Sequence, residues 1–281
     1  MKAFLAMLLP CLLLVGCGGS SSSTETNNTT PPPVTPPATG SWYKPAVSSS
    51  WQLQLQGTVN TGYDVDIYDI DLFDTPEQTI TDLHAAGRRV ICYFSGGSYE
   101  DWRSDANQFP SAVLGNNLDG WPGERWLDVR SADLRNIMLQ RLDLAVGKGC
   151  DGVDVDNMDG YTNNSGFPLT ANDQLAYNRF IANAAHDRHL AVALKNDLDQ
   201  IADLVDYFDL AVNEECFDYT ECDLLTPFVQ QGKPVLQVEY TQTYVNNATA
   251  RANLCTDSLN LQFSTLILPL ALDDSFRYGC Q

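Results

Sequence analysis

Carboxyl side chains end two short apolar runs of this sequence, and their spacing suits acid–base chemistry. Asp154 and Asp156 close one run, and Glu214 and Glu215 close another. Residues two apart in an extended strand point to the same face, so Asp154 and Asp156 are expected to share a face. Carboxyl groups held this close raise one another's pKa, so one can stay protonated while another stays ionised. Such a site can donate a proton and supply a nucleophile.

Together with these two runs, several more strand-like runs end in functional side chains. The strand-end residues are Tyr93 and Ser95, Asp128, Asp156 and Asn157, Lys195 and Asn196, Glu214 and Glu215, and Glu239 and Tyr240. In an α/β barrel the carboxyl ends of all strands meet at one rim, which is where the active site lies. The sequence therefore predicts a single polar site at that rim.

The remaining composition excludes several kinds of chemistry. The three histidines, His84, His186 and His189, fall near the C-terminal ends of predicted helices, at the opposite face of a barrel. The predicted site therefore lacks the histidine that serine and cysteine hydrolases need, and it lacks the histidine ligands of a zinc enzyme. We find no phosphate-binding glycine motif, and we expect no cofactor. Paired carboxyls alone are the equipment of glycoside hydrolysis.

A calcium site is the competing interpretation of the segment that contains Asp154 and Asp156. The segment begins like a calcium-binding loop, but Met158 occupies the third ligand position and no glutamate ends the loop. We therefore expect no metal.

Residues 41–281 must form the domain that positions these side chains. Strand-like runs occupy 51–55, 65–70, 89–94, 125–129, 152–157, 191–196, 210–215, 235–240 and 265–269, and the clearest helices are expected at 75–86, 132–146 and 171–188. Strands that alternate with helices imply parallel pairing, so the predicted fold class is an α/β, (β/α)8 TIM barrel. Nine runs exceed eight strands, and 56–63 leaves no room for a helix. One run must lie outside the barrel, and the sequence does not show which.

The N-terminus predicts export. A basic start is followed by an apolar run over 3–16, too short to span a bilayer, which takes about 20 residues. Residues 14–17, Leu-Val-Gly-Cys, match a bacterial lipobox, so 1–16 is predicted to be a lipoprotein signal peptide and Cys17 the acylated residue. Residues 17–40 form a Ser/Thr/Pro-rich linker that should stay extended. We expect a membrane-anchored lipoprotein on the periplasmic or cell-surface side; the alternative is an ordinary signal peptide with a chance cysteine.

The other cysteines agree with export, because an even number in an exported domain suggests disulfides. Many connectivities are possible. The expected pairs are Cys216–Cys222 across a short loop, then Cys255–Cys280 and Cys92–Cys150. The sequence has no CxxC pair and no histidine beside these cysteines, which argues against zinc.

Charge restricts the partners. The chain has 16 Lys and Arg residues and 36 Asp and Glu residues, which gives a formal net charge of −20. Such a charge argues against nucleic acid and suits a cationic or neutral ligand. Solvent ions screen the field beyond about 8 Å, so only carboxylates near a ligand would matter. We expect a monomer.

Several blocks of the sequence resemble glycoside hydrolase family 114, the endo-α-1,4-polygalactosaminidases. The blocks are 51–57 (WQLQLQG), 66–71 (DIYDID), 90–103 (VICYFSGGSYEDWR), 152–161 (GVDVDNMDGY), 194–197 (LKND) and 211–217 (AVNEECF). They follow the family order and cover most of the domain. The resemblance implies a (β/α)8 fold and internal cleavage of α-1,4-linked galactosamine polymers found in microbial biofilms.

The family's catalytic acids fall on Asp156 and Glu214. By similarity to related glycosidases, Asp156 would be the nucleophile and Glu214 the general acid/base. The family often has Glu at position 154 and Gln at 215, so the extra carboxyl of Glu215 puts the tuning of Glu214 in question. The expected substrate-binding residues are Asp69, Tyr93, Ser95, Asp128, Asp154, Asn157, Asp159, Tyr161, Lys195, Asn196, Glu215, Glu239 and Tyr240.

The implied substrate is a cationic, galactosamine-rich polysaccharide. Its ammonium groups could pair with carboxylates beside the catalytic acids, namely Asp154, Asp159, Glu215 and Glu239. Stacking on sugar rings is a possible role for Tyr93, Tyr161, Tyr240, Trp121 and Trp126.

Three alternatives remain open at this point. The chain could be a non-catalytic carbohydrate-binding lipoprotein, or a structural or assembly lipoprotein. It could also be a glycosidase for neutral galactose or N-acetylgalactosamine polymers. Retention and inversion of anomeric configuration depend on the separation of the carboxyls, which a sequence does not give.

Overall fold

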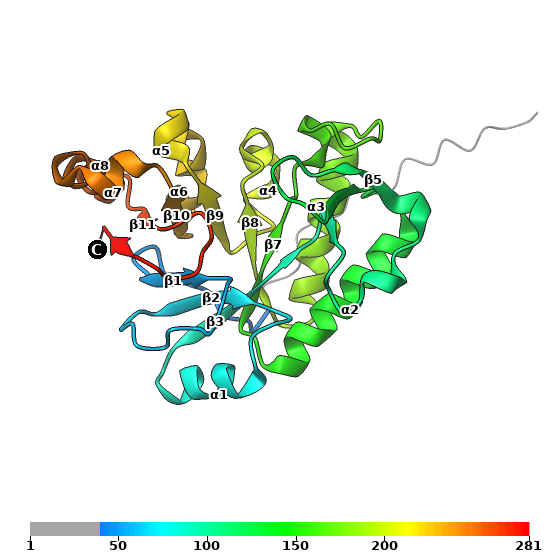
Figure 1. Ribbon diagram of the computed structural model, residues 1–281, viewed down its shortest axis with the longest axis horizontal. Helices are drawn as coiled ribbons and strands as arrows, with labels where there is room; N and C mark the ends of the chain where they lie inside the picture. The colour runs from blue at the N-terminus through cyan, green and yellow to red at the C-terminus, as the bar shows by residue number, and fades with distance from the viewer. Residues whose placement is uncertain (1–39, 281) are drawn as a thin grey trace, which may run out of the picture. The chain divides into compact units, whose positions relative to one another are not determined.

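The computed structural model describes residues 40–280, which form an α/β domain around a curled sheet (Figure 1). The predicted signal peptide, the lipidated Cys17 and the linker up to residue 39 lie outside the described residues. The eight parallel strands of the sheet are, in order, β1 (Trp51–Gln54), β2 (Ile67–Asp71), β3 (Arg89–Ser95), β7 (Gly152–Asp156), β8 (Ala191–Lys195), β9 (Leu210–Glu214), β10 (Val235–Glu239) and β11 (Ser264–Ile267). A ninth strand, β12 (Tyr278–Gly279), pairs antiparallel with β11.

Helices connect the successive parallel strands after β2, as the alternating pattern predicts. They are α1 (Glu77–Ala85), α2 (Ala132–Lys148), α3 (Ala171–His186), α4 (Ile201–Leu204), α5 (Cys216–Tyr219), α6 (Thr226–Gln230), α7 (Gln242–Asn246) and α8 (Ala248–Asn260). The connection from β1 to β2 has no helix, in agreement with the short gap in the sequence. None of the helices within residues 40–280 is long and apolar enough to cross a bilayer. The predicted α/β fold class, with eight parallel strands, is confirmed.

Local signals define the ends of the two longest helices. Ser131 caps α2 by accepting hydrogen bonds from the next turn, and α2 ends at Gly149, whose φ of 84° suits glycine. A capping box of Thr170 and Asp173 begins α3. These caps place the start of strands β7 and β8, and through them the residues that end those strands.

The strand-like run at 125–129 is the one that lies outside the barrel. Its residues form β6 (Glu124–Leu127), which pairs antiparallel with β4 (Ser98–Glu100) and β5 (Leu114–Asn117) in a separate three-stranded sheet. This small sheet belongs to the long connection between β3 and α2, residues 96–131, which we call the β3–α2 insert. The insert accounts for the ninth run that the sequence left unassigned.

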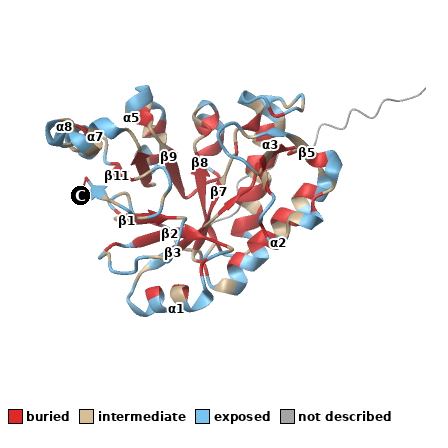
Figure 2. Ribbon diagram, in the orientation of Figure 1, coloured by how far each residue is buried: buried red, intermediate tan, exposed pale blue. Residues whose placement is uncertain are grey.

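Two apolar clusters hold the sheet. One packs its convex side against the helices, whose buried residues face the sheet and whose exposed residues face away (Figure 2). Within residues 40–280, side-chain and loop hydrogen bonds rather than a backbone ladder link β1 to β11; Trp51 Nε1 donates to the Ser264 carbonyl oxygen at 2.8 Å. The other cluster fills the concave side, and its members include Trp51, Ile67, Ile91, Val212, Leu236 and Val238.

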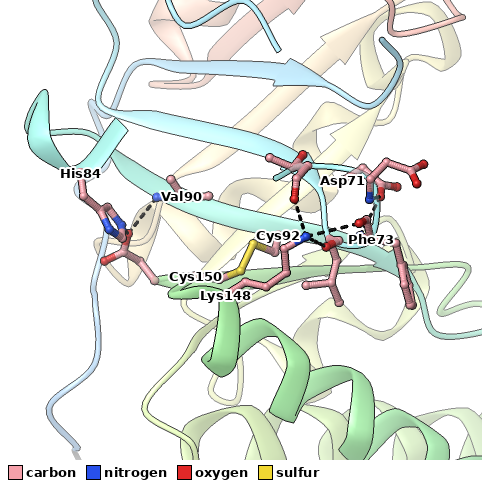
Figure 3. The surroundings of a disulfide bond; sticks show 11 residues. Asp71, Phe73, His84, Val90, Cys92, Lys148 and Cys150 are labelled. Carbon is pink, nitrogen blue, oxygen red and sulfur yellow. Dashed lines mark hydrogen bonds and ion pairs between the residues drawn. A yellow bond between two sulfur atoms is a disulfide. The ribbon is translucent and has the colours of Figure 1, made fainter. Parts of the chain in front are cut away.

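Three disulfides join the cysteines of residues 40–280, and they are the pairs proposed from the sequence: Cys92–Cys150, Cys216–Cys222 and Cys255–Cys280. The first joins β3 to the residue after α2 and closes a sequence separation of 58 (Figure 3). In the chain-entropy model a loop of this length contributes about 4 kcal/mol to stability. Lys148 lies beside this bond and donates to the carbonyl oxygens of Leu72, Phe73 and Thr75. The disulfide therefore closes the segment that contains both the β3–α2 insert and α2, and Lys148 ties the end of α2 to the loop after β2.

The histidines lie where the sequence predicts, at the amino-terminal side of the strands. His84, in the last turn of α1, is 2.7 Å from Asp151, which precedes β7 (Figure 3). His186 ends α3 and is 2.8 Å from Asp209, which precedes β9. His189 follows in the turn after α3. These contacts fasten helices to the base of the sheet.

Candidate active site

Two carboxyls and one ammonium meet at the carboxyl ends of three neighbouring strands. Asp156, Lys195 and Glu214 are the last residues of β7, β8 and β9. The Lys195 Nζ atom lies 3.0 Å from an Asp156 oxygen and 3.3 Å from a Glu214 oxygen. These two carboxyl oxygens therefore cannot be farther apart than the sum of the two distances. The inward face that Asp156 shares with Asp154 is the one the spacing of two predicts, because Val153 and Val155 pack on the other side.

Asp156 is held in its ionised form. Burial alone would raise the pKa of Asp156, but the Lys195 ammonium and the hydroxyl of Tyr93 outweigh burial and lower that pKa below its usual range. Tyr93 donates its hydroxyl hydrogen bond at 2.7 Å, and the backbone N–H of Asn157 donates another at 2.8 Å. Burial and the charge of Asp156 raise the pKa of Tyr93, so this hydroxyl remains a donor.

Glu214 is oriented by three donors. The Tyr240 hydroxyl donates to one oxygen at 2.6 Å, and Asn196 donates to the other at 3.1 Å, close to Lys195. Asn196 also accepts a hydrogen bond from the backbone N–H of Glu214, which fixes the amide. The Glu214 side chain is 29% exposed and that of Asp156 is 18% exposed, so Glu214 has the better access to a proton from solvent.

Lys195 remains charged although it is fully enclosed. Burial alone would lower the pKa of Lys195, but the carboxyls of Asp156, Glu214 and Asp154 together raise it well above its ordinary value. A buried charge is tolerated only when it is paired and hydrogen-bonded. The site therefore contains a permanent cation between its two principal acids.

Asp69 and Asp154 form a second carboxyl pair below the first. Both side chains are buried, Asp69 on β2 and Asp154 on β7. Burial, followed by the charge of Asp154, raises the pKa of Asp69 well above its usual range, and burial raises the pKa of Asp154 to about 7. Neither carboxyl oxygen of Asp69 has a donor among the described residues, so a hydrogen bond between Asp69 and Asp154 requires one of the two carboxyls to be protonated. The pair therefore shares a proton at neutral pH, while Asp156 above it stays ionised.

The site opens into an acidic cleft of about 780 Å³. Its carboxyl-bearing lining residues are Asp71, Asp74, Glu100, Asp119, Glu124, Asp154, Asp156, Asp159 and Glu214. The cations of the lining are Arg103 and Lys195, and Arg103 is already paired with Asp71 at 2.7 Å and with Glu100 at 2.8 Å. The cleft therefore offers carboxylates to a ligand.

A second hollow of about 410 Å³ continues the cleft on the other side of Glu214. The two hollows share Asp159, Asn196 and Glu214. The second hollow adds four more carboxyls, from Asp197, Asp199, Glu215 and Glu221. Burial and then the charge of Asp159 raise the pKa of Asp197 to about 8. The groove thus contains Asp156 and Glu214, and the second hollow extends it beyond the first.

Most of the predicted site residues line this groove. Those in the first hollow are Tyr93, Asp154, Asn157, Asp159, Lys195, Asn196 and Tyr240, together with Asp156 and Glu214. Tyr161 and Glu215 line the second hollow. Four predicted substrate-binding residues, Asp69, Ser95, Asp128 and Glu239, are not among the residues that line either hollow.

Glu239 was placed at the rim incorrectly because a strand end does not fix which way a side chain points, and Asp69, expected to bind substrate, does not line either hollow. Glu239 alternates with Tyr240 at the end of β10, so it faces the helices, where it accepts a hydrogen bond from the backbone N–H of Phe217. Burial raises the pKa of Glu239 to about 7. Asp69 does face the concave side, but it lies one layer below the cleft, beside Asp154.

The insert explains the other two corrections. Ser95 is covered by the insert, where its hydroxyl lies 2.7 Å from that of Ser98 and accepts a hydrogen bond from Asn157. Asp128 follows β6, which is not a barrel strand, and its carboxyl is paired with Arg130 at 2.8 Å. Both residues therefore support the insert and the start of α2.

The same insert supplies cleft residues that the sequence analysis did not identify. They include Glu100, Trp102, Arg103, Asn117, Asp119 and Glu124. Residues 96–151 make a connection far longer than one crossover helix needs, and long loops at the carboxyl ends of barrel strands carry function. That length was the available signal. Trp121 and Trp126, considered for sugar stacking, do line the cleft.

Comparison with known proteins gives consistent matches. The model of glycoside hydrolase family GH114 matches residues 32–281. The crystal structure of Ega3 from Aspergillus fumigatus, a complex with galactosamine, is 44% identical with a TM-score of 0.81, covering 86% of this chain and 100% of that one. The glycoside hydrolase domain of PelA from Pseudomonas aeruginosa is 14% identical with a TM-score of 0.64, covering 82% and 97%, and shows a likeness of fold. An uncharacterized protein of Deinococcus radiodurans is 30% identical over 242 residues, which are 73% of this chain and 77% of that protein.

The carboxyl pair Asp69–Asp154 predicts an unusual pH dependence of stability. Carboxyls whose pKa is raised by folding stabilise the folded state at low pH, and this contribution is lost as pH rises through their folded pKa. In Asp69→Asn the amide donates permanently to Asp154, so that titration disappears. The free energy of unfolding should then fall less steeply between pH 6 and 8 than in the parent, by roughly 1 kcal/mol per pH unit for one proton. Urea unfolding at a series of pH values measures this.

Asp187→Asn, at an exposed position after α3, is the matched control and should keep the parental slope. Equal pH slopes in Asp69→Asn and the parent would contradict the shared proton.

Proposed function

We propose that this chain, which belongs to glycoside hydrolase family GH114, cleaves α-1,4-linked galactosamine polymers internally with Asp156 and Glu214 as its catalytic carboxyls. The observation that carries the proposal is the placement of both carboxyls within 3.3 Å of the single Lys195 ammonium, at the carboxyl ends of β7 and β9. Each acid also accepts a hydrogen bond from one tyrosine hydroxyl. Ega3, at 44% identity, was crystallised with galactosamine, which supports the same sugar here.

Asp156 acts as the nucleophile because it is ionised and firmly held. Its carboxylate bonds to the anomeric carbon while the glycosidic C–O bond breaks and Glu214 gives its proton to the leaving oxygen. Water then attacks the same carbon, Glu214 takes a proton from that water, and the bond to Asp156 breaks. Tyr93 and Lys195 keep Asp156 in the charged form that the first step needs.

The separation of the two acids fits a retaining reaction. Their nearest recorded oxygens are bounded by contacts of 3.0 and 3.3 Å to Lys195. The sum of these contacts is shorter than the about 6.5–9.5 Å that inverting enzymes use to admit a water, whereas retaining enzymes use about 5–5.5 Å. This upper bound supports the proposal of a covalent intermediate on Asp156.

The acidic groove supports a polymer that carries ammonium groups. Nine carboxyl side chains line the first hollow, and its Arg103 is already neutralised by Asp71 and Glu100. Several of these carboxyls already have a cation beside them, but a neutral galactose polymer would leave Asp119 and Asp159 without a cationic partner, whereas a galactosamine polymer can form charge-assisted hydrogen bonds with them. Hollows on both sides of Glu214 leave room for sugar units in both directions, which supports internal cleavage.

Loss of either catalytic carboxyl should abolish cleavage while the fold is kept. Asp156→Asn and Glu214→Gln conserve size and hydrogen bonding, and each should lower kcat on α-1,4-linked galactosamine polymer by about 10²–10⁴-fold or more. Sizing of released oligosaccharides measures turnover, and circular dichroism monitors folding. Asp187→Asn is again the control. Parental turnover in either variant would remove that residue from its role.

Retention predicts the anomer of the first product. Cleavage of an α-linked polymer should release new reducing ends that are α before mutarotation, because two displacements at the anomeric carbon restore its configuration. Proton NMR during the first minutes of reaction distinguishes the anomers. If the β-anomer appears first, Asp156 is not a nucleophile, and the acids act through a water instead.

We further propose that the protein is exported as a monomer and anchored to a membrane by a lipid on Cys17. The lipobox at 14–17 and the low apolar content of 20–40 support this, as do three disulfides, which persist in oxidising compartments. In bacteria that express the full chain, the parent should partition into a detergent phase and Cys17→Ala into the aqueous phase, because acyl chains supply the membrane affinity. Identical partitioning of the two proteins would show that Cys17 carries no anchor.

A further inference from the structure

Two exposed tryptophans stand out on the wall of the cleft. The side chains of Trp102 and Trp121 are 52% and 49% exposed, and both line the first hollow. Large apolar side chains exposed together beside a cleft mark a contact surface. Both residues belong to the β3–α2 insert, whereas Asp156 and Glu214 belong to barrel strands.

The Trp102 ring, which follows β4, packs against the separate turn between β5 and β6 that carries Trp121. A Cβ atom on Gly123 would lie 2.9 Å from a ring carbon of Trp102, so the Trp102 indole packs over the backbone of Gly123, two residues from Trp121. The backbone N–H of Asp101 donates to the Gly123 carbonyl oxygen at 3.1 Å. Gly123 has a φ of 96°, which favours glycine, so the close approach depends on that residue. We call Trp102 and Trp121 the tryptophan wall.

Carboxyls accompany the tryptophan wall. Asp119, in the same turn, and Asp74 and Glu124 line the same hollow. The Glu124 carboxyl accepts a hydrogen bond from Ser98 at 2.7 Å, which fixes its position in the insert. An aromatic face beside carboxylates matches the two sides of an amino sugar, since the ring has apolar C–H groups and the ammonium is attracted both to carboxylates and to an indole face.

We propose that the tryptophan wall is a second sugar-binding subsite, which takes a galactosamine unit with a free ammonium group from the same polymer that the catalytic pair cleaves. The inference rests on the proposed function for the identity of the sugar. Continuity of the wall with the catalytic cleft and its charge complementarity to ammonium select this occupant. A long chain whose scissile bond lies at Asp156 then also contacts the tryptophan wall. A single sugar bound at the catalytic pair does not contact it.

Binding without turnover tests the subsite directly. In an Asp156→Asn background, calorimetry compares galactosamine with α-1,4-linked galactosamine oligosaccharides of increasing length. The double substitution Trp102→Ala and Trp121→Ala should weaken binding of the longest oligosaccharides about tenfold, which corresponds to about 1.4 kcal/mol. Binding of galactosamine itself should not change. Leu259→Ala, which removes a 55% exposed apolar side chain from α8, is the matched control and should bind like the background.

The charge of the wall has its own test. Asp119→Asn should weaken binding of long deacetylated oligosaccharides, and it should leave fully N-acetylated ones unchanged because they carry no ammonium. Unfolding midpoints of all variants should match the background, since the substituted side chains are exposed.

Three results would overturn the subsite. One is unchanged affinity for long oligosaccharides in the double variant, and another is an equal loss for galactosamine and long chains. The third is a dimer, detected by ultracentrifugation, that the double variant abolishes, because the wall would then be an interface between copies. If the background variant binds no galactosamine oligosaccharide of any length, the substrate class of the proposed function falls, and the subsite with it.

Discussion

The compensation of several carboxyls by one buried ammonium is the constraint on which this site depends. Asp69, Asp154, Asp156 and Glu214 converge on the concave side of the sheet, and Lys195 is the cation in contact with the upper two. Charges removed from water must be paired, and surplus carboxyls must take up protons. The interior meets both conditions by sharing a proton in its lower layer and keeping Asp156 ionised in its upper layer. The chemistry of the site is thus a result of charge balance in a packed barrel.

The barrel strands supply the charged residues at the centre of the site, and the insert supplies a wall of the cleft. Parallel strands end at one rim and bring Asp156, Lys195 and Glu214 together whatever their separation in sequence. The strands alone would leave a shallow rim. The β3–α2 insert adds a side wall with aromatic and acidic side chains, and its own three-stranded sheet supports that wall.

The sequence predicted the features that depend on local periodicity. It did not predict how far below the cleft a side chain lies or which face it points to. Spacing of two placed Asp154 and Asp156 on one face, and strand ends brought Asp156 and Glu214 to one rim. Glu239 was misplaced because the last two residues of a strand point to opposite faces, and the pattern does not say where the rim begins. Asp69 was expected to bind substrate but lines neither hollow, because its depth below the cleft is not given by the sequence pattern. The cleft residues of the insert were missed because irregular connections carry no period.

The disulfide Cys92–Cys150 holds the barrel together on both sides of the segment that contains the insert. It pins β3 to the end of α2, so the residues between them leave and re-enter the sheet at fixed points. The backbone N–H groups of Gly96 and Gly97 donate to the Asp156 carbonyl oxygen, so the start of this connection is tied to β7 and its outer turns are the part that can vary. Evolution or protein engineering can therefore change the polymer-binding surface of the insert while the residues at the strand ends stay the same. New specificities can arise in this way on one unchanged barrel.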